Sequence, residues 1–149
     1  MEPLSSPPEV LLCDVDGTVA LRGDRSPFPG PEGELRSGED LPNEPVIRVL
    51  RDLRASTPEV VFLSGRTEAA RWRTEMWLRT HVLEPGEWPM LHLRAVGDTR
   101  PDDVVKGELF DRYVAGRYRV RLVLDDRDRV VAMWRARGLL VLQVAPGAF

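Results

Sequence analysis

The sequence Val10-Leu11-Leu12-Cys13-Asp14-Val15-Asp16-Gly17-Thr18 joins an apolar run of strand length to two acidic residues and a glycine turn. Alternate side chains of an extended segment point the same way, so Asp14 and Asp16 are expected to face one small volume. Two carboxylates that close repel each other unless a cation or a shared proton intervenes. The pattern therefore predicts a buried strand that ends at a site for a hard divalent cation such as Mg²⁺.

Two further apolar runs end in polar residues in the same way. Residues 60–63 lead into Ser64-Gly65-Arg66, and residues 120–124 lead into Asp125-Asp126-Arg127. Lys106 is the only lysine of the chain, beside twenty arginines, which indicates a need for a compact ammonium at this position. Open α/β sheets bind ligands at the carboxyl ends of their strands, so these polar residues are expected to converge. A lone D-x-D-G-T stretch also begins calcium loops, whereas the converging set favours phosphoryl chemistry.

The hydrophobic pattern predicts a repeating order of strands and helices. Strands are expected at residues 10–14, 59–64, 90–94, 119–125 and 139–144, and helices at residues 44–56, 68–83, 102–115 and 127–137. Asn43 and Asp102 are expected to cap two of these helices, and Gly138 to end the last one. Such alternation predicts one α/β domain over residues 1–149, with a doubly wound, Rossmann-like, mostly parallel sheet that carries helices on both faces.

Residues 21–41 form a long connection without a strong helix or strand pattern. Its part from residue 29 to residue 40 is rich in proline, glycine and glutamate, so we expect that part to be exposed and mobile. The connection is too short and too polar to form a separate cap domain over the strand ends. The active site is therefore expected to be open, which suits the end of a polymer better than a small metabolite.

The order of the polar segments, a carboxylate pair followed by serine, lysine and an acidic pair, resembles the haloacid-dehalogenase superfamily of phosphatases. Within it, the chain looks like the phosphatase domain of the bacteriophage polynucleotide kinase-phosphatase. The stretches Arg25-Ser26-Pro27-Phe28, Gly97-Asp98-Thr99-Arg100 and Met133-Trp134-Arg135 carry this narrower likeness, which runs from about Leu11 to Phe149. Ser26 departs from it, because glycine is usual after the arginine. The resemblance implies a fold with a minimal cap and a Mg²⁺-dependent polynucleotide 3′-phosphatase that heals DNA or RNA ends.

The resemblance also implies roles for individual residues, and these roles suit their chemistry. Asp14 is expected to attack phosphorus and to form an aspartyl-phosphate. Asp16 is expected to give a proton to the departing sugar oxygen, which requires a raised pKa for this carboxyl group. Ser64 and Lys106 are expected to bind the phosphate oxygens and to neutralise their charge.

Metal ligands are expected from the Asp14 carboxylate, from the main-chain carbonyl of Asp16, and from one or both of Asp125 and Asp126. Asp102 matches an acidic position of the family, although a role as helix cap fits it equally well. Substrate contacts are expected from Thr18, Arg25, Gly65, Arg66 and Arg94.

Composition limits the remaining options. The chain has 149 residues, 42% of them hydrophobic, which suffices for one core and leaves no room for a second domain. It has no G-x-x-x-x-G-K-[ST] phosphate loop, so 5′-phosphorylation, where needed, is expected of another polypeptide. A separate kinase or ligase is the expected protein partner. The sequence shows no signal peptide and no membrane-spanning stretch. Its single Cys13 excludes an internal disulfide, so a reducing, cytoplasmic setting is expected.

The formal net charge of −3 is unevenly distributed. Residues 1–45 carry ten acidic and three basic residues, whereas residues 46–149 carry fourteen acidic and eighteen basic residues. The basic excess of the larger part suits a nucleic-acid strand, and ordinary solvated surface explains it equally well.

Two alternatives to an end-healing 3′-phosphatase stay open at this point. The same scaffold could serve a phosphatase of free nucleotides or other small phosphomonoesters. It could also serve a catalytically silent nucleic-acid-binding subunit of a repair complex, whose expected mark is a damaged motif, but all four motifs are intact. The sequence does not determine whether the chain forms a homodimer, prefers RNA or DNA, or acts on 2′,3′-cyclic phosphates.

Overall fold

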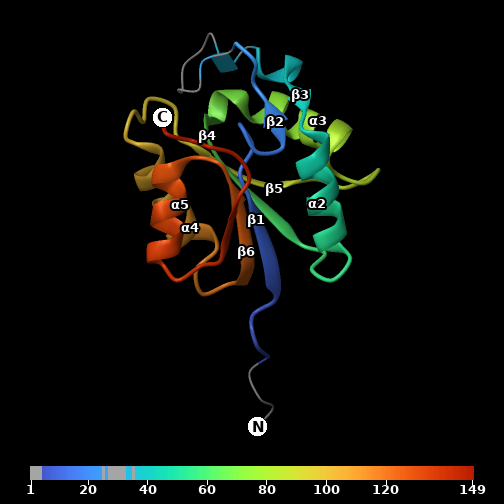
Figure 1. Ribbon diagram of the computed structural model, residues 1–149, viewed down its shortest axis with the longest axis vertical. Helices are drawn as coiled ribbons and strands as arrows, with labels where there is room; N and C mark the ends of the chain where they lie inside the picture. Colours follow the sequence, from blue (N-terminus) through green and yellow to red (C-terminus); the bar gives the residue numbers. More distant parts are fainter. Residues whose placement is uncertain (1–4, 25, 27–32, 35) are drawn as a thin grey trace.

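A five-stranded parallel sheet forms the centre of the computed structural model, which describes residues 5–24, 26, 33–34 and 36–149 (Figure 1). Its strands are β1 (Glu9–Cys13), β4 (Val60–Thr67), β5 (Met90–Arg94), β6 (Arg119–Asp125) and β7 (Val141–Gln143). The strand order is β5-β4-β1-β6-β7, and every pair of neighbours runs parallel. The predicted class and the five expected strands are confirmed, although the last strand is shorter than expected.

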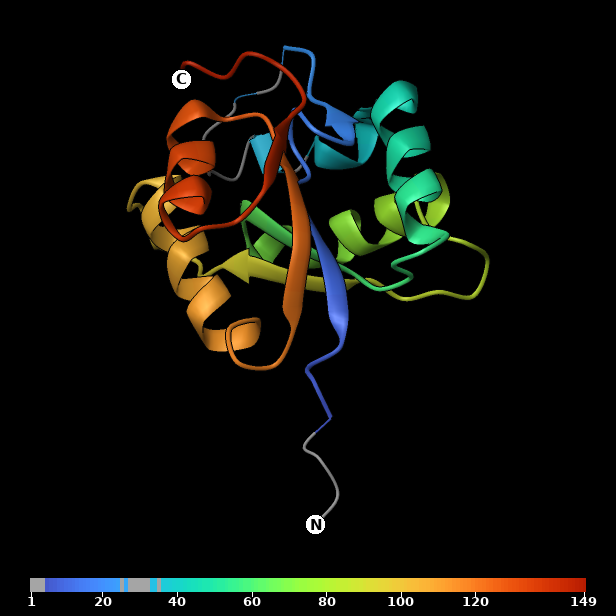
Figure 2. The ribbon, with the colours of Figure 1, turned by 60° about the horizontal axis from the view of Figure 1, so that its bottom comes forward.

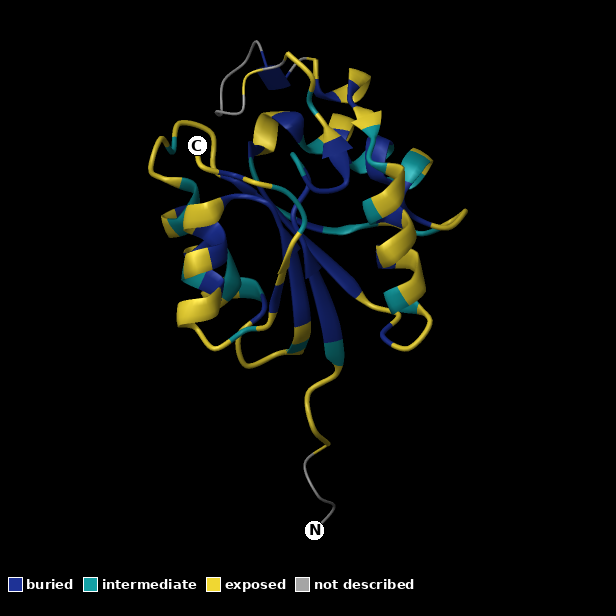
Figure 3. Ribbon diagram, in the orientation of Figure 1, coloured by how far each residue is buried: buried dark blue, intermediate teal, exposed yellow. Residues whose placement is uncertain are grey.

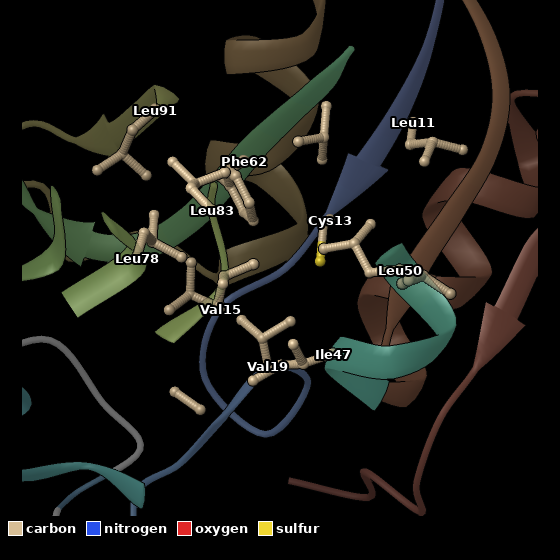
Figure 4. Close-up of a cluster of buried hydrophobic side chains, with 14 of the residues drawn as sticks. Leu11, Cys13, Val15, Val19, Ile47, Leu50, Phe62, Leu78, Leu83 and Leu91 are labelled. Carbon is tan, nitrogen blue, oxygen red and sulfur yellow. The ribbon is translucent and has the colours of Figure 1, made fainter. Parts of the chain in front are cut away.

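The central strand β1 sends its side chains alternately into two hydrophobic clusters. Leu11 and Cys13 belong to one cluster, and Val10 and Leu12 belong to the other. All four side chains are at most 1% exposed. A strand buried on both faces reads as a continuous apolar run, which explains the pattern of this segment. Figure 4 shows the first cluster, in which Cys13 lies among aliphatic and aromatic side chains.

Helices cover both faces of the sheet (Figures 1 and 2). α2 (Glu44–Arg54) and α3 (Arg71–His81), the latter preceded by the 3-10 turn η2 (Glu68–Ala70), pack into the first cluster. α4 (Asp102–Tyr113) and α5 (Asp128–Ala136) pack into the second cluster. Buried residues line the sheet and the inner sides of the helices (Figure 3), so the doubly wound arrangement is confirmed. No helix among the described residues is long and apolar enough to cross a membrane.

The helix ends correct two of the expected caps. Asn43 precedes α2, but its side chain makes no capping hydrogen bond, and its Nδ2 instead donates to the carbonyl of Thr18 at 2.8 Å. Pro101 occupies the cap position of α4, so Asp102 is the first helical residue, and its carboxylate pairs with a guanidinium instead. Gly138 follows α5 with a φ of 83°, as expected of a residue that ends a helix.

The connection between β1 and α2 holds only short elements. An antiparallel pair joins β2 (Ala20–Leu21) to β3 (Leu41–Pro42), and the 3-10 turn η1 (Ser37–Glu39) precedes β3. These elements lie at the carboxyl edge of the main sheet (Figure 1). The described part of the connection therefore forms no separate domain.

Part of this connection is held tightly against the sheet. Residues 29–32 and 35 lie outside the described residues, but Glu34, Ser37 and Asp40 are buried. The carboxylate of Glu34 accepts hydrogen bonds from the amide and the hydroxyl of Thr67 at 2.6 and 2.7 Å. The expectation of an exposed segment is wrong for these three residues, because Glu34 and Asp40 bond Thr67 and Arg66 at the end of β4, and the hydroxyl of Ser37 donates to the carbonyl of Glu34.

His92 of β5 stacks on Tyr113 of α4, with ring centroids 4.0 Å apart and an angle of 6° between the planes. Burial, and then the charge of Arg71, lower the pKa of His92. The imidazole therefore favours its neutral form in the folded chain.

Candidate active site

The carboxyl ends of three neighbouring strands bring the polar sequence segments together. Asp14 follows β1, Ser64 lies in β4, and Asp125 ends β6. Lys106 reaches the same point from α4, where its Nζ donates to Oδ1 of Asp14 at 2.7 Å and to Oδ2 of Asp125 at 3.2 Å. The segments converge at the carboxyl edge of the sheet, as the topology of an open α/β fold requires.

Lys106 is the buried centre of this charge cluster. Its side chain is 1% exposed, and its Nζ also lies 3.9 Å from a carboxylate oxygen of Asp102. Burial by itself would lower the pKa of Lys106, but the charges of Asp125, Asp14 and Asp102 together raise it well above its usual range. The side chain is therefore a fixed positive charge among carboxylates.

Asp14 is held at both of its carboxylate oxygens. Oδ1 accepts from Lys106, and Oδ2 accepts from the hydroxyl of Thr18 at 2.8 Å. Burial and the neighbouring Asp125 raise the pKa of Asp14 well above its usual range, and Lys106 opposes this shift. Thr18 is fully buried and its hydroxyl is bonded to Asp14, and its expected substrate contact stays a prediction.

Asp16 forms a two-point ion pair with Arg66. Nε and Nη2 of Arg66 donate to Oδ2 and Oδ1 of Asp16 at 3.0 and 2.6 Å. The sequence led us to expect a proton on Asp16 because of the nearby charge of Asp14. The structure shows both oxygens of this carboxylate at hydrogen-bond distance from the guanidinium of Arg66, and the proton on Asp16 stays a prediction.

Arg66 connects Asp16 with two other parts of the chain. Its side chain is 2% exposed, and its Nη2 also donates to Asp40 at 2.8 Å. Its Nη1 donates to the hydroxyl of Thr74 at 2.9 Å. The main-chain carbonyl of Asp40 in turn accepts from the indole of Trp77 at 2.8 Å. These contacts hold Arg66 beside Asp16, and the expected substrate contact of Arg66 stays a prediction.

Asp125 uses both carboxylate oxygens for contacts within the protein. Oδ1 accepts from the main-chain amides of Asp126 and Arg127 at 2.9 and 3.4 Å. Oδ2 accepts from Lys106 and from the indole of Trp134, both at 3.2 Å. A carboxylate oxygen offers two lone pairs, so these four donors fill the acceptor capacity of Asp125.

Asp126 lies against the glycine turn of the first segment. Gly17 has a φ of 79°, and an added Cβ would overlap with Oδ2 of Asp126. Burial and the charge of Asp125 raise the pKa of Asp126. Carboxylate oxygens of Asp14, Asp125 and Asp126 lie within 4.8 Å of one another, and all three residues are buried. Oxygen ligands crowded in this way fit a hard divalent cation, because its charge offsets their mutual repulsion.

The end of β4 after Ser64, where the pairing with β5 shifts register, packs against the start of α4. An added Cβ on Gly65 would overlap with Oδ1 of Asp102, so only glycine permits this approach. Arg94 has a side chain that is 2% exposed, and it donates to the carbonyl of Gly65 at 2.8 Å and to Asp102 at 2.9 Å. Ser64 is 1% exposed, and its Oγ accepts from the amide of Arg66 at 3.2 Å. Arg94 thus joins the end of β4 to the start of α4, and its expected substrate contact stays a prediction.

One expected substrate contact is not described by the structure, and several residues of the site were not indicated by the sequence. Arg25, an expected substrate contact, lies outside the described residues. Arg127 pairs with Asp102 at 3.3 Å and belongs to the segment that carries the family likeness, but nothing in the sequence indicated its partner. The other side chains that the sequence did not indicate are Asp40, Thr74 and Trp134.

This combination of a doubly wound sheet with acidic, serine and lysine segments at one edge defines the haloacid-dehalogenase class of phosphatases. Residues 8–149 match the model of one family, described as the polynucleotide kinase PNKP phosphatase domain, and the chain belongs to that family. Membership supports a phosphatase activity in nucleic-acid end repair.

Similar proteins agree with this family. A putative bifunctional polynucleotide kinase/RNA ligase of Autographa californica nuclear polyhedrosis virus is 34% identical over 129 residues, which are 86% of this chain and 18% of that protein. A solved structure described as the Pnkp1/Rnl/Hen1 RNA repair complex matches with 35% identity and a TM-score of 0.86, over 100% of this chain and 46% of the other. Another, of the Pnkp1/Rnl/Hen1 complex, matches with 36% identity and a TM-score of 0.86, over 97% of this chain and 48% of the other. The chain therefore spans less than half the length of each of these relatives.

Proposed function

We propose that the chain is one catalytic domain that removes the phosphate from 3′-phosphorylated ends of DNA or RNA, with Mg²⁺ as its cofactor. The observation that carries this proposal is the buried ammonium of Lys106, which contacts Asp14 and Asp125 where the ends of β1 and β6 meet. Family membership, and a relative described as a polynucleotide kinase and RNA ligase, support polynucleotide ends as the substrate.

Asp14 serves as the nucleophile of the proposed reaction. Its carboxylate attacks the phosphorus in line, the bond from phosphorus to the 3′ oxygen breaks, and an aspartyl-phosphate forms. Asp16 gives a proton to the departing 3′ oxygen and then takes one from the water that attacks the aspartyl-phosphate. The water step releases inorganic phosphate and restores Asp14. Thr18 and Lys106 support the first step, because they hold the two oxygens of Asp14 in place.

The transferred phosphoryl group is bound by Ser64, Gly65 and Lys106 in this proposal. The hydroxyl of Ser64 and the amide of Gly65 donate to its oxygens, and Lys106 neutralises the charge that spreads over them. Arg66 fixes the carboxylate of Asp16 in the orientation from which it reaches the leaving oxygen. A loss of any of these groups should lower the rate more than the affinity.

The proposed metal ligands are the carboxylates of Asp14 and Asp126 and the main-chain carbonyl of Asp16. Asp125 is assigned to the support of Lys106 instead, because protein donors fill both of its oxygens. When bound, Mg²⁺ would offset the charge of the crowded carboxylates and of the phosphoryl group.

A ligase is the proposed user of the product. Ligation requires a 3′-hydroxyl end, which is what the proposed reaction leaves. The chain contains no phosphate-loop motif, and similar solved structures are described as Pnkp1/Rnl/Hen1 complexes, one of them as an RNA repair complex. We therefore place the kinase and ligase steps on other domains or chains.

Phosphate release from a 3′-phosphorylated oligonucleotide, with and without Mg²⁺, tests the proposal. A 5′-phosphorylated oligonucleotide and a 3′-mononucleotide serve as comparison substrates. We expect Mg²⁺-dependent release from the 3′-phosphorylated substrates alone, fastest on the oligonucleotide and absent in Asp14→Asn. Asp111→Asn is the matched control, because it removes an exposed carboxylate that pairs with Arg137 and makes no contact with the site.

Other outcomes would redirect the proposal. Equal or faster release from the mononucleotide would assign the domain to small phosphomonoesters. Release from 5′ ends would contradict the assignment to 3′ ends. Absence of release from every substrate would favour a nucleic-acid-binding role.

A further inference from the structure

Trp134 of α5 links the hydrophobic core to the acidic pair. It is 1% exposed and has the largest of the fully buried side chains among the described residues. Its ring packs on the ring of Phe110 of α4, with centroids 5.5 Å apart, within the second hydrophobic cluster. Its Nε1 donates to Oδ2 of Asp125 at 3.2 Å.

The N–H group of this indole does more than fill space. An apolar side chain such as phenylalanine can occupy a core position without a buried donor, whereas a buried indole has to find an acceptor. The acceptor found here is a carboxylate oxygen that also receives the ammonium of Lys106. A core residue thus takes part in the polar network of the site.

We propose that Trp134 is a positioning residue for the reaction, acting through Asp125 and Lys106 on the nucleophile. The indole holds Oδ2 of Asp125 at 3.2 Å, and the same oxygen holds Nζ of Lys106 at 3.2 Å. Nζ of Lys106 in turn holds Oδ1 of Asp14 at 2.7 Å. This inference rests on the proposed phosphatase function.

Two features make the indole the critical donor in this network. Oδ1 of Asp125 is fixed by main-chain amides, whereas Oδ2 depends on two side chains. The ammonium of Lys106 is shared between Oδ2 of Asp125 and Oδ1 of Asp14, whereas the indole is rigid and held by packing in the second hydrophobic cluster. Without the indole, Oδ2 has a free lone pair and can turn towards the cation site. Lys106 would then lose the fixed acceptor that orients it.

The variant Trp134→Phe tests this inference, because it keeps an aromatic ring and removes the N–H donor. Phe110→Leu is the matched control, since it loosens the packing around Trp134 and leaves the hydrogen bond available. We expect kcat of Trp134→Phe to fall about 10- to 100-fold, as is common for residues that orient catalytic or metal-binding groups. KM should stay unchanged, because the buried indole cannot touch substrate.

Comparison of kcat with thermal stability separates positioning from packing. Both variants should lose melting temperature, but only Trp134→Phe should lose kcat. A kcat of Trp134→Phe within twofold of the wild type would overturn the proposal. An equal loss of kcat in Phe110→Leu would also overturn it, because packing alone would then explain the effect.

Two additional measurements keep this test independent of the proposed substrate. p-Nitrophenyl phosphate requires the phosphatase chemistry but no polynucleotide, so its hydrolysis preserves the comparison if the oligonucleotide is not a substrate. The indole ¹H–¹⁵N resonance of Trp134, identified by its loss in Trp134→Phe, reports the contact without any turnover. We expect it to move upfield in Asp125→Asn, because a neutral amide oxygen is a weaker acceptor than a carboxylate. An unmoved resonance would contradict the hydrogen bond on which the proposal depends.

Discussion

Replacement of Gly17 by alanine tests the close approach of the first segment to Asp126. The φ of Gly17 is 79°, and an added Cβ would overlap with Oδ2 of Asp126. Alanine in this left-handed region costs about 1 to 2 kcal/mol. For a chain of this size, that cost lowers the melting temperature by about 2 to 8 °C. The overlap adds a separate effect, because the Asp126 carboxylate has to move out of the proposed metal site.

The effect on catalysis should greatly exceed the effect on stability. Displacement of a catalytic group by about 1 Å lowers a rate about 100-fold. We therefore expect Gly17→Ala to lose about that factor in kcat and to need more Mg²⁺ for half-maximal activity. Gly116→Ala is the matched control, because Gly116 has a φ of 76° and nothing within 4 Å of its added Cβ. It carries the same backbone cost without the overlap.

The assay measures phosphate release against Mg²⁺ concentration for both variants, with melting temperatures from calorimetry. Similar melting temperatures with a loss of activity confined to Gly17→Ala would support the assignment of Asp126 as a metal ligand. If Gly17→Ala keeps more than half of the wild-type kcat, catalysis does not require the carboxylate of Asp126 in the position that the structure shows. If Gly116→Ala loses as much activity, backbone strain rather than displacement explains both results.

Three further measurements test other contacts. Thr18→Val keeps nearly the same side-chain shape and removes the hydroxyl that donates to Asp14. We expect kcat to fall about tenfold, as for the loss of a hydrogen bond to a charged group. An unchanged kcat would refute the role of this hydroxyl. Because burial lowers the pKa of His92, its contribution to the free energy of unfolding is complete above about pH 6.5 and is lost as the pH falls from there towards the folded-state pKa. Urea unfolding between about pH 8 and pH 5 measures this effect. The free energy of unfolding should change less with pH in His92→Phe than in the wild type, and an equal change in both would contradict this reasoning. Glu34→Gln should speed hydrogen exchange at the amide of Thr67, whereas unchanged exchange would show that Glu34 does not clamp the end of β4.

Most of the fold follows from patterns within single segments. The apolar run before Asp14 reads as a strand because neighbouring strands and helices cover both of its faces. The end of α5 was predictable from Gly138, since a positive φ of 83° suits glycine. The two expected caps failed because the competing partners of Asn43 and Asp102 come from other segments. A short polar side chain next to a helix start satisfies whichever donor or acceptor the tertiary fold brings to it.

Within residues 29–40, the expected exposure is wrong for Glu34, Ser37 and Asp40, for a related reason. Proline, glycine and glutamate predict a solvated loop when each residue is considered alone. Glu34 and Asp40 are buried because Thr67 and Arg66 offer charge-assisted or multiple hydrogen bonds. No residue near Glu34 or Asp40 in the sequence indicates which partners they have.

The amino-acid sequence alone indicated the strands, the helices, the acidic and serine segments at the ends of apolar strands, and Lys106 within a helix, because these features depend on neighbours within a few residues. Parallel topology then required the segments to meet at one edge of the sheet. Only the tertiary structure decided which groups touch: Lys106 and Asp14 lie 92 residues apart, and Arg66 and Asp16 lie 50 apart. It also showed that protein donors occupy both carboxylate oxygens of Asp125, whereas the carboxylate of Asp126 lies against Gly17. Such choices depend on how whole elements pack, because packing sets the distance between residues that lie far apart in the sequence.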